Sequence, residues 1–404
     1  MEEKNLTRFF EQYIQQQSVF ANRRALQTDF QPETIVHRDD QITAVAKVLA
    51  PLLRGERPNN LFIYGYPGTG KTLVAQFCAR QLQQLAESRS LPFFVTYINC
   101  KLRRTADTEY RLVAQLAASL GRNVPATGLP TDEVYQIFYK ELEQRKCAML
   151  IILDEIDALV ERTDDQLLYN LVRINEQLQH SKITLVGVSN NTTFKDDLDP
   201  RVRSSLSEEE VVFPRYNALQ LIEILQSRAS VAFTPNALED GVLQKCAAIA
   251  AQEHGDARRA LTLLRTAGEL CERDNGTFIK IQHIDAADAA IEHESIVELV
   301  RGQPKQHNAV LYALFHCSAQ RKQAVFTGEI YERYQQVCNT INLRPLTQRR
   351  ISDILQEFDM VGIIQSKVIS KGRYGRSREI ETTLAPKTLS MVHSIISDAL
   401  SLPQ

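Results

Sequence analysis

Three mostly apolar runs in the first half of the chain, the third interrupted by Thr184 and Gly187, have the length of buried strands. They are Leu61 to Tyr64, Ala148 to Leu153 and Ile183 to Val188, and each is followed by glycine, acidic or polar residues. Apolar runs of this kind are typical of parallel strands that are covered on both faces. The pattern predicts an α/β domain built on a parallel sheet, which we place at residues 1–213.

Residues 106–146 lie between the first and second of these runs and have a helical pattern of their own. Apolar residues recur at helical spacing over residues 109–120 and 132–145, and a Pro-Ala-Thr-Gly turn at 125–128 separates them. We therefore expect two helices inserted into the α/β domain.

Helical spacing also dominates residues 214–296. Apolar side chains recur at Leu219, Ile222 and Leu225 and again at Ala260, Leu263 and Leu264. This region is predicted to be a helical domain that forms a lid on the first.

Residues 297–404 combine an amphipathic helix with two short strands. From residue 347 to 356, the apolar face carries Ile351, Ile354 and Leu355, and the outward face carries Gln348, Arg349, Ser352 and Gln356. Thr347 is placed to cap this helix. With a helix near residues 328–340 and strands near 363–370 and 378–383, the pattern predicts a winged-helix domain.

The composition is that of a globular chain with more than one core. The 404 residues are 44% hydrophobic and 24% charged, and this length suggests two or three domains. No stretch approaches the roughly 18 apolar residues needed to cross a bilayer, and the N-terminus lacks a signal-peptide pattern. The seven cysteines are scattered without a Cys-x-x-Cys pair. We expect a cytoplasmic protein with no membrane partner and no structural zinc.

A net charge of −2 conceals an uneven distribution of charge. Residues 301–404 hold 14 Lys and Arg against 8 Asp and Glu, a net charge of +6, whereas residues 1–300 carry −8. Residues 365–378 contain five cations and no acid. Many basic runs are solvated loops, but beside an outward-facing polar helix this one favours DNA over a protein partner. The helix would enter the major groove and the hairpin tip the minor groove.

Residues 65–72 read Gly-Tyr-Pro-Gly-Thr-Gly-Lys-Thr and directly follow the first apolar run. In such a loop, glycines let backbone N–H groups turn toward phosphate, the lysine contacts the outer phosphates and the threonine hydroxyl can hold Mg²⁺. The helix that begins near Lys71 adds its positive end. The strand, loop and helix context is more specific than a Gly-rich turn. It predicts an ATP or GTP site formed by Pro67, Gly68, Thr69, Gly70, Lys71 and Thr72.

Two further strand ends carry the polar groups that hydrolysis requires. Asp154 and Glu155 follow the second apolar run, and Asn190 follows the third. Parallel sheets bind ligands at the carboxyl ends of their strands, where Asp154 and Thr72 can hold Mg²⁺. Glu155 can polarise the attacking water and Asn190 can orient it. Taken alone, Glu155 would also fit a helix cap and Asn190 a turn.

These motifs, in this order, resemble the AAA+ ATPases. Residues 198–206, Leu-Asp-Pro-Arg-Val-Arg-Ser-Ser-Leu, look like the region that presents an arginine finger, and residues 255–261, Gly-Asp-Ala-Arg-Arg-Ala-Leu, look like the sensor-2 helix of the lid. The resemblance implies that Arg201, or alternatively Arg203, acts in trans on a neighbouring subunit. It also implies that Arg258 contacts the γ-phosphate, so that the nucleotide state sets the angle of the lid. An exposed arginine pair, Arg258 with Arg259, is the alternative.

More specifically, residues 20–380 resemble the archaeal initiator family that is related to the eukaryotic origin recognition complex and the cell-division-control helicase loader. The match lies in His-Arg-Asp at 37–39, in the insertion at 106–146, in 346–362 as the recognition helix and in 368–380 as the β-wing. The implied nucleotide contacts include Val36, His37, Arg38 and Tyr216. The implied DNA contacts are Arg122, Thr127 and Gly128 in the insertion, Thr347, Gln348, Arg349 and Arg350 on the helix, and Lys371, Arg373, Tyr374 and Arg376 in the wing.

The resemblance implies an ATP-dependent replication initiator that binds and deforms duplex origin DNA and recruits the minichromosome-maintenance helicase, alongside other copies on DNA. ATP, ADP and Mg²⁺ would be its cofactors, hydrolysis would be a slow switch, and the protein would associate with the nucleoid. Two other functions stay open, because the fold does not separate them. One is a DNA-binding transcriptional regulator or inhibitory paralogue, and the other is a helicase loader that binds DNA without sequence preference.

Overall fold

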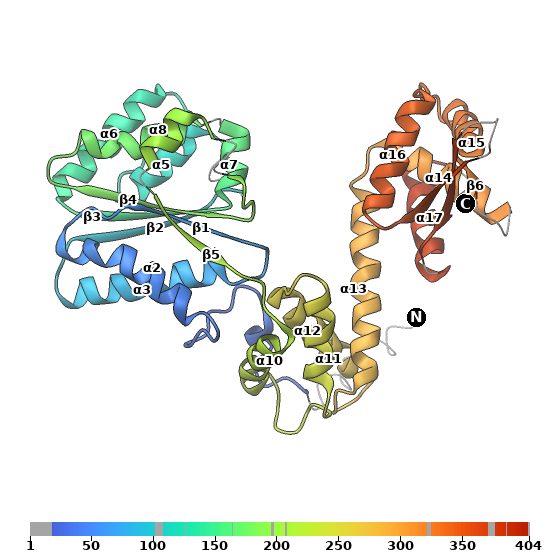
Figure 1. The fold of residues 1–404 in the computed structure, drawn as a ribbon, viewed down its shortest axis with the longest axis horizontal. Helices are drawn as coiled ribbons and strands as arrows, with labels where there is room; N and C mark the ends of the chain where they lie inside the picture. The colour runs from blue at the N-terminus through green and yellow to red at the C-terminus, as the bar shows by residue number, and fades with distance from the viewer. Residues whose placement is uncertain are drawn as a thin grey trace, which may run out of the picture. The chain divides into compact units, whose positions relative to one another are not determined.

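The computed structural model describes residues 18–101, 108–125, 127–163, 165–194, 198–206, 208–320, 325–370, 376–384 and 386–402 (Figure 1). The chain divides into two compact units, Met1–Ile284 and Asp285–Gln404. The first unit contains a parallel sheet and a helical lid, and the second contains a winged helix. The predicted α/β fold with a lid and a C-terminal winged helix is confirmed. None of the helices in the described ranges is long and apolar enough to cross a membrane.

Five parallel strands form the sheet of the first unit, in the order β2-β3-β4-β1-β5. Their bounds are β1 Asn60–Gly65, β2 Phe93–Asn99, β3 Ala148–Asp154, β4 Lys182–Ser189 and β5 Glu208–Phe213. The three strands predicted from apolar runs are β1, β3 and β4, and they lie side by side in the centre. Nearly all of their residues are buried, which explains why their sequences lack the alternation of half-exposed strands.

Helices cover both faces of this sheet (Figure 1). The helices of one face are α2 Asp39–Leu49, which continues into the 3₁₀ helix η2 Ala50–Arg54, and α3 Lys71–Ser88. The helices of the other face are α5 Glu109–Ser119, α6 Thr131–Arg145, α7 Ile156–Thr163 and α8 Gln166–Arg173, followed by η3 Ile174–Glu176 and α9 Pro200–Leu206. Leu61 and Ile63 of β1 belong to the first core, and Phe62 and Tyr64 belong to the second. A slip of one residue would exchange the two faces, so the double burial fixes the register.

The lid follows β5 and consists of α10 Ala218–Ala232, α11 Val242–Gln252 and α12 Ala257–Arg273. A capping box begins α10, because the Asn217 side chain accepts the Gln220 N–H at 2.9 Å and the Gln220 side chain accepts the Asn217 N–H at 3.1 Å. Helix α13 spans Ile281–Arg301.

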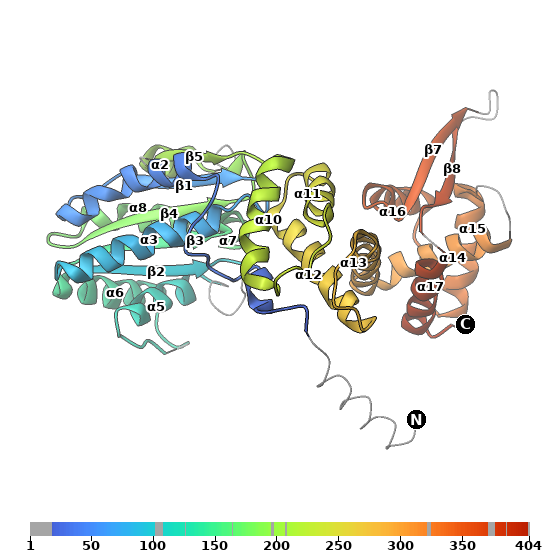
Figure 2. The same cartoon turned by 90° about the horizontal axis from the view of Figure 1, so that it is seen from below.

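The described chain begins on the lid, where residues 18–26 with the 3₁₀ helix η1 Arg23–Leu26 lie against α10 and α12 (Figure 2). Phe20 stacks on Phe233 with 5.0 Å between ring centroids. The buried carboxylate of Glu272 on α12 accepts hydrogen bonds from Ser18 Oγ, from the backbone N–H of residue 19 at 3.2 Å and from Arg23 Nη2 at 2.6 Å. The N-terminal segment is therefore an integral part of the lid, which sequence patterns did not predict.

The second unit packs helices around a three-stranded antiparallel sheet in the order β6-β8-β7. Its elements are α14 Lys305–Gln320, β6 Val325–Phe326, α15 Thr327–Thr340, α16 Gln348–Met360, β7 Ile364–Ser370, β8 Arg376–Thr382 and α17 Pro386–Leu400. The predicted apolar face of α16 is buried, and Thr347 caps the helix by accepting the Arg350 N–H at 3.4 Å. Strands β7 and β8 form a hairpin that projects from the helices (Figure 2).

Gly268 on α12 leaves the space that the Phe20 ring fills, because a Cβ at this position would lie 2.5 Å from Phe20 Cζ. Gly268→Ala is expected to displace Phe20 and to destabilise the N-terminal segment by about 1–3 kcal/mol, as over-packing does. Hydrogen exchange of backbone amides in residues 18–26 checks this, with faster exchange as the expected result. Gly302→Ala is the control, because its Cβ meets nothing nearer than 3.6 Å. Unchanged exchange in Gly268→Ala would show that Phe20 does not depend on this gap.

Candidate functional site

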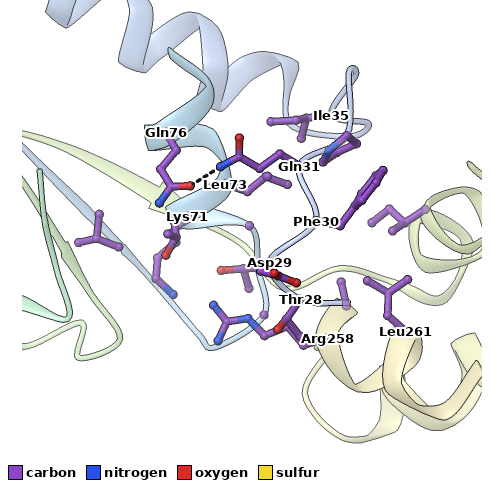
Figure 3. A pocket seen from close by; sticks show the side chains of 18 of the residues that line it. Thr28, Asp29, Phe30, Gln31, Ile35, Lys71, Leu73, Gln76, Arg258 and Leu261 are labelled. Atoms are coloured by element: carbon purple, nitrogen blue, oxygen red, sulfur yellow. Dashed lines mark hydrogen bonds between the residues drawn. The ribbon is translucent and has the colours of Figure 1, made fainter. Parts of the chain in front are cut away.

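A cavity of about 600 Å³ lies within the first unit at the carboxyl ends of the strands (Figure 3). The phosphate-binding loop and the start of α3 line one side of it, and the ends of β3 and β4 line the floor. The N-terminal segment at residues 28–36 and the lid helices α10 and α12 line the remaining side. The cavity thus collects residues from distant parts of the chain around the predicted nucleotide loop.

Glycine is required at two points of the loop. Gly65 has φ of 155°, and a Cβ there would lie 2.6 Å from the carbonyl oxygen of Phe213. Gly68 has φ of 69°, and a Cβ there would collide with the carboxylate of Asp256 on the lid. Gly70, at φ of 88°, precedes α3, whose first residue is Lys71. The first two glycines therefore let the loop pass between β5 and the lid.

The Lys71 ammonium is buried at the base of the loop. Its Nζ donates to the carbonyl oxygens of Gly65 and Tyr66, both at 2.7 Å, and to Oδ1 of Asn190 at 2.9 Å. Burial and the nearby positive charge of Arg258 lower the pKa of Lys71 to about 8. A phosphate oxygen beside this group would favour its charged form, so the site is electrostatically prepared for an anion.

The predicted metal-binding pair, Thr72 and Asp154, is assembled by the structure. Thr72 Oγ1 donates to Asp154 Oδ2 at 2.9 Å, and the Tyr97 hydroxyl donates to the same oxygen at 2.7 Å. Asp154 Oδ1 accepts the backbone N–H of Glu155 at 3.1 Å. A hydroxyl and a carboxylate that converge at a phosphate loop are the oxygen donors that Mg²⁺ prefers, so these residues fit the ion. Tyr97 keeps the carboxylate in place and was missed in the sequence.

Glu155 follows the end of β3 in a left-handed backbone conformation, with φ of 54°. Its carboxylate lies 4.0 Å from the Lys101 ammonium, at the limit of an ion pair, and it lines the cavity together with Asn190. Because Asn190 Oδ1 accepts from Lys71, the amide NH₂ of Asn190 is the group left to orient a water or a phosphate. The two residues predicted to act on water thus share the floor of the cavity.

The lid contacts the phosphate loop directly. Ala257 N donates to the carbonyl oxygen of Gly68 at 3.2 Å, and Asp256 caps α12 by accepting from Arg258 N at 2.7 Å and Arg259 N at 3.4 Å. The Arg258 side chain reaches from α12 into the cavity that also holds Lys71 (Figure 3). Arg259 instead pairs with Glu253, with 2.7 Å between Nε and Oε2. The two adjacent arginines therefore have different surroundings, and Arg258 is the one at the cavity.

Arg38 supports the loop from behind. It is 2% exposed and donates to the carbonyl oxygens of Thr69 at 3.0 Å and Pro214 at 2.7 Å, and its guanidinium lies 3.8 Å from the Tyr216 ring centre. Burial lowers the pKa of Arg38. His37 points to the lid, with 2.9 Å from its Nε2 to Glu223 Oε2. Of the four residues expected near the nucleotide, Val36 and Tyr216 line the cavity, and His37 and Arg38 hold its walls together.

The other predicted contacts lie on the surface of the first unit. Arg201 and Arg203 are exposed on α9, and Arg201 Nε lies 3.6 Å from Asp199 Oδ1. Arg122, Thr127 and Gly128 are exposed in the turn between α5 and α6. The Tyr110 hydroxyl donates to the carbonyl oxygen of residue 125 at 2.6 Å and so attaches this turn to α5.

On α16 of the second unit, the four predicted contacts Thr347, Gln348, Arg349 and Arg350 are exposed together at the N-terminal end. Arg350 is partly engaged within the helix, because Nη2 lies 3.4 Å from Glu357 Oε1 and Nη1 lies 4.0 Å from Asp353 Oδ2. The predicted contacts Lys371, Arg373 and Tyr374 lie outside the described residues, as does the side chain of Arg376, whose backbone begins β8.

The largest group that sequence reasoning missed is the N-terminal wall at residues 28–35, which faces Ile224, Arg228 and Leu261 of the lid. These residues have no motif spacing. They can be recognised from tertiary contacts, because the N-terminal segment packs on a lid that lies some two hundred residues later in the sequence.

The lowered pKa of Lys71 predicts a pH-dependent affinity for nucleotide. Above about pH 8 the free protein loses the Lys71 charge, so ATP affinity should fall, approaching about tenfold per pH unit. The stability of the ligand-free protein should depend on pH in the opposite direction. The folded pKa lies below the ordinary 10.5, so stability should rise as pH increases from about 8 toward 10.5. Titration calorimetry with ATP between about pH 7.5 and about pH 9.5 checks the affinity. Lys71→Arg, which stays charged, should bind with little dependence on pH, and an equal slope in both proteins would contradict the assignment.

Three protein families match the chain in consecutive segments. They are an AAA domain at residues 54–192, a Cdc6 AAA+ ATPase-type lid domain at residues 222–289 and a CDC6 C-terminal winged helix domain at residues 298–391. Their order follows the sheet, lid and winged helix of the structure.

Individual proteins match over nearly the whole chain. The ORC1-type DNA replication protein 1 of Archaeoglobus fulgidus is 48% identical over 94% of this chain and 92% of its own length. The ORC1-type DNA replication protein of Pyrococcus abyssi is 44% identical over 95% of this chain and 92% of its own. The solved structure of the Aeropyrum pernix ORC1 protein in complex with DNA has a TM-score of 0.79 at 41% identity, covering 94% of this chain and 97% of that one. The chain therefore belongs to the family of archaeal ORC1/Cdc6-type replication proteins, AAA+ proteins with a C-terminal winged helix.

Proposed function

We propose that this protein is an ATP-dependent replication initiator that binds and deforms duplex origin DNA and recruits the replicative helicase. The observation that carries the proposal is the presence, in one chain, of a cavity built around a complete phosphate-binding loop and of a winged helix whose α16 exposes polar residues at its N-terminal end. The names of the relatives and the DNA bound to the Aeropyrum pernix protein support it.

At the ATP site, each residue has a role that fits its position. The loop residues 68–70 receive the phosphates on backbone N–H groups, Pro67 shapes the loop, and Lys71 and Arg258 contact the outer phosphates. Thr72 and Asp154 would hold Mg²⁺, which supplies charge neutralisation between the phosphates when it is bound. Glu155 takes the proton of the attacking water, and Asn190 orients that water. Hydrolysis at this site is proposed to be slow and to act as a switch between nucleotide states.

The angle of the lid would depend on which nucleotide is bound. Arg258 sits on the same helix whose first turn contacts Gly68, so removal of the γ-phosphate changes the forces at this contact. Exposed Arg201, or Arg203, is proposed to complete the site of a neighbouring copy on DNA. The minichromosome-maintenance helicase is the proposed partner of the nucleotide-bound form.

Proposed DNA contacts fall into two groups. The N-terminal end of α16, with Gln348 and Arg349 exposed, is suited to base edges in the major groove. The basic wing and the turn at residues 122–128 are suited to phosphates and to the minor groove, where a small turn can approach closely and help to bend the duplex. Specificity would then come from the helix and deformation from the other contacts.

Selection from a random duplex pool, with ATP present, tests the proposal. The full chain should enrich discrete sequences that it binds roughly 10³-fold more tightly than scrambled duplex at the same salt concentration. Arg349→Ala should reduce this preference by about 5-fold to 100-fold, with little change for scrambled DNA, because one base contact is lost. Arg301→Ala, an exposed cation at the end of α13, should leave both affinities unchanged.

Uniform binding with no enriched sequence and steep loss in salt would reject the initiator and support a helicase loader that uses non-specific DNA contacts. Enriched sequences that lie at promoters rather than at a replication origin would support a transcriptional regulator.

Glu155→Gln should lower the ATP turnover number by about 10²-fold or more, because the amide cannot accept a proton. ATP binding should persist, because the substitution leaves unchanged the loop residues, Lys71 and Arg258 that are proposed to hold the phosphates. Steady-state hydrolysis and titration calorimetry measure the two effects separately. The exposed Glu161 on the following helix provides Glu161→Gln as a matched control. Wild-type turnover in the Glu155 variant would assign the general base to another residue.

A further inference from the structure

Arg228 of helix α10 is a buried cation in the wall of the ATP cavity. The side chain belongs to a residue that is 8% exposed and that lines the cavity. Its Nη2 donates to the carbonyl oxygen of Phe30 at 3.2 Å, and the guanidinium lies 4.7 Å from the centre of the Phe30 ring. One face and one nitrogen of the guanidinium are therefore fixed by the N-terminal segment.

The second terminal nitrogen, Nη1, has no hydrogen-bond partner among the residues that the structure describes. This atom is also inaccessible to solvent. Burial lowers the pKa of Arg228. An unpaired, buried donor on a charged group is destabilising, and a ligand or an ordered water that accepts from it would relieve that cost.

The position of Arg228 indicates which part of a nucleotide would complete it. Phe30 and Leu261 lie at one end of the cavity, away from Lys71 (Figure 3). The residues labelled at this end, Phe30, Ile35 and Leu261, are apolar (Figure 3). When the triphosphate lies on Lys71 and Arg258, the flat, apolar purine is the part that reaches this end, and a purine carries acceptors only at its edges.

We propose that Arg228 recognises the nucleobase, with Nη1 donating to a ring nitrogen of the adenine while Nη2 stays on Phe30. This assignment rests on the proposed ATP site and adds a specificity-determining contact to it. The same guanidinium then joins the base, the N-terminal segment and the lid, so that the base itself helps to close the cavity.

Binding of 1-deaza-, 3-deaza- and 7-deaza-ATP to the full chain tests the contact, because each analogue replaces one ring nitrogen by C–H. One analogue should bind wild type about tenfold or more weakly than ATP, as expected for loss of a hydrogen bond to a charged group. Arg228→Met, which retains an apolar stem on Phe30, should bind ATP about tenfold more weakly and show no penalty for that same analogue.

Phe30→Leu is the matched control, because it alters the same wall and keeps the guanidinium. It should weaken ATP binding and retain the penalty for the analogue. Two results would overturn the proposal: wild type that binds all three analogues as tightly as ATP, or an equal penalty in wild type and Arg228→Met. The first result needs no variant and so does not depend on the variant's folding. Failure of wild type to bind ATP at all would instead refute the proposed function.

Discussion

The buried charge of Lys71 constrains which strands lie side by side in the first unit. The Lys71 ammonium has three acceptors, and they come from the end of β1 and from the residue after β4. These acceptors meet because β1 and β4 are parallel neighbours, with Tyr64 in register with Ser189. A different strand order would remove the Asn190 acceptor and leave the buried cation with the two carbonyl groups of its own loop. The chemistry of the loop therefore depends on a topology that is set by apolar residues far from it.

The charge of Lys71 also couples the position of the lid to the bound ligand. Lys71 and Arg258 repel each other across the cavity, and this repulsion contributes to the low pKa of Lys71. In the ligand-free protein, closure of the lid must oppose this repulsion, while the approach of Ala257 to Gly68 fixes how near the lid can come. Phosphate between the two cations would reverse the sign of the interaction. On these grounds the number of phosphates, more than the presence of the base, would set the strength of closure.

Local sequence patterns predicted much of the fold and part of the candidate site. Strands β1, β3 and β4, the phosphate loop and α16 were predictable because burial on two faces, glycine spacing and helical amphipathicity leave marks on neighbouring residues. The strand order and the place of residues 18–36 on the lid were not predictable, because they arise from contacts such as Ser18 with Glu272 and Phe30 with Arg228. Arg38 shows what a motif leaves undetermined. The family resemblance placed it near the nucleotide, but whether it faces the cavity or supports the loop depends on carbonyl groups supplied by the residue after β5 and by the loop.

Charge pairing on α16 assigns affinity and specificity to different parts of the proposed DNA surface. Glu357 accepts from His307 and lies 3.4 Å from Arg350, and Asp353 also approaches Arg350, so the positive charge of Arg350 is balanced within the domain. A balanced helix gains little from the long-range attraction of phosphates, and its preference for a duplex must come from short-range contacts to base edges. The surplus of cations lies instead in the hairpin sequence, which Arg378 connects to the helix through Gln356 at 3.4 Å. Affinity and specificity would thus reside in different elements of one small domain, and salt should weaken the first far more than the second.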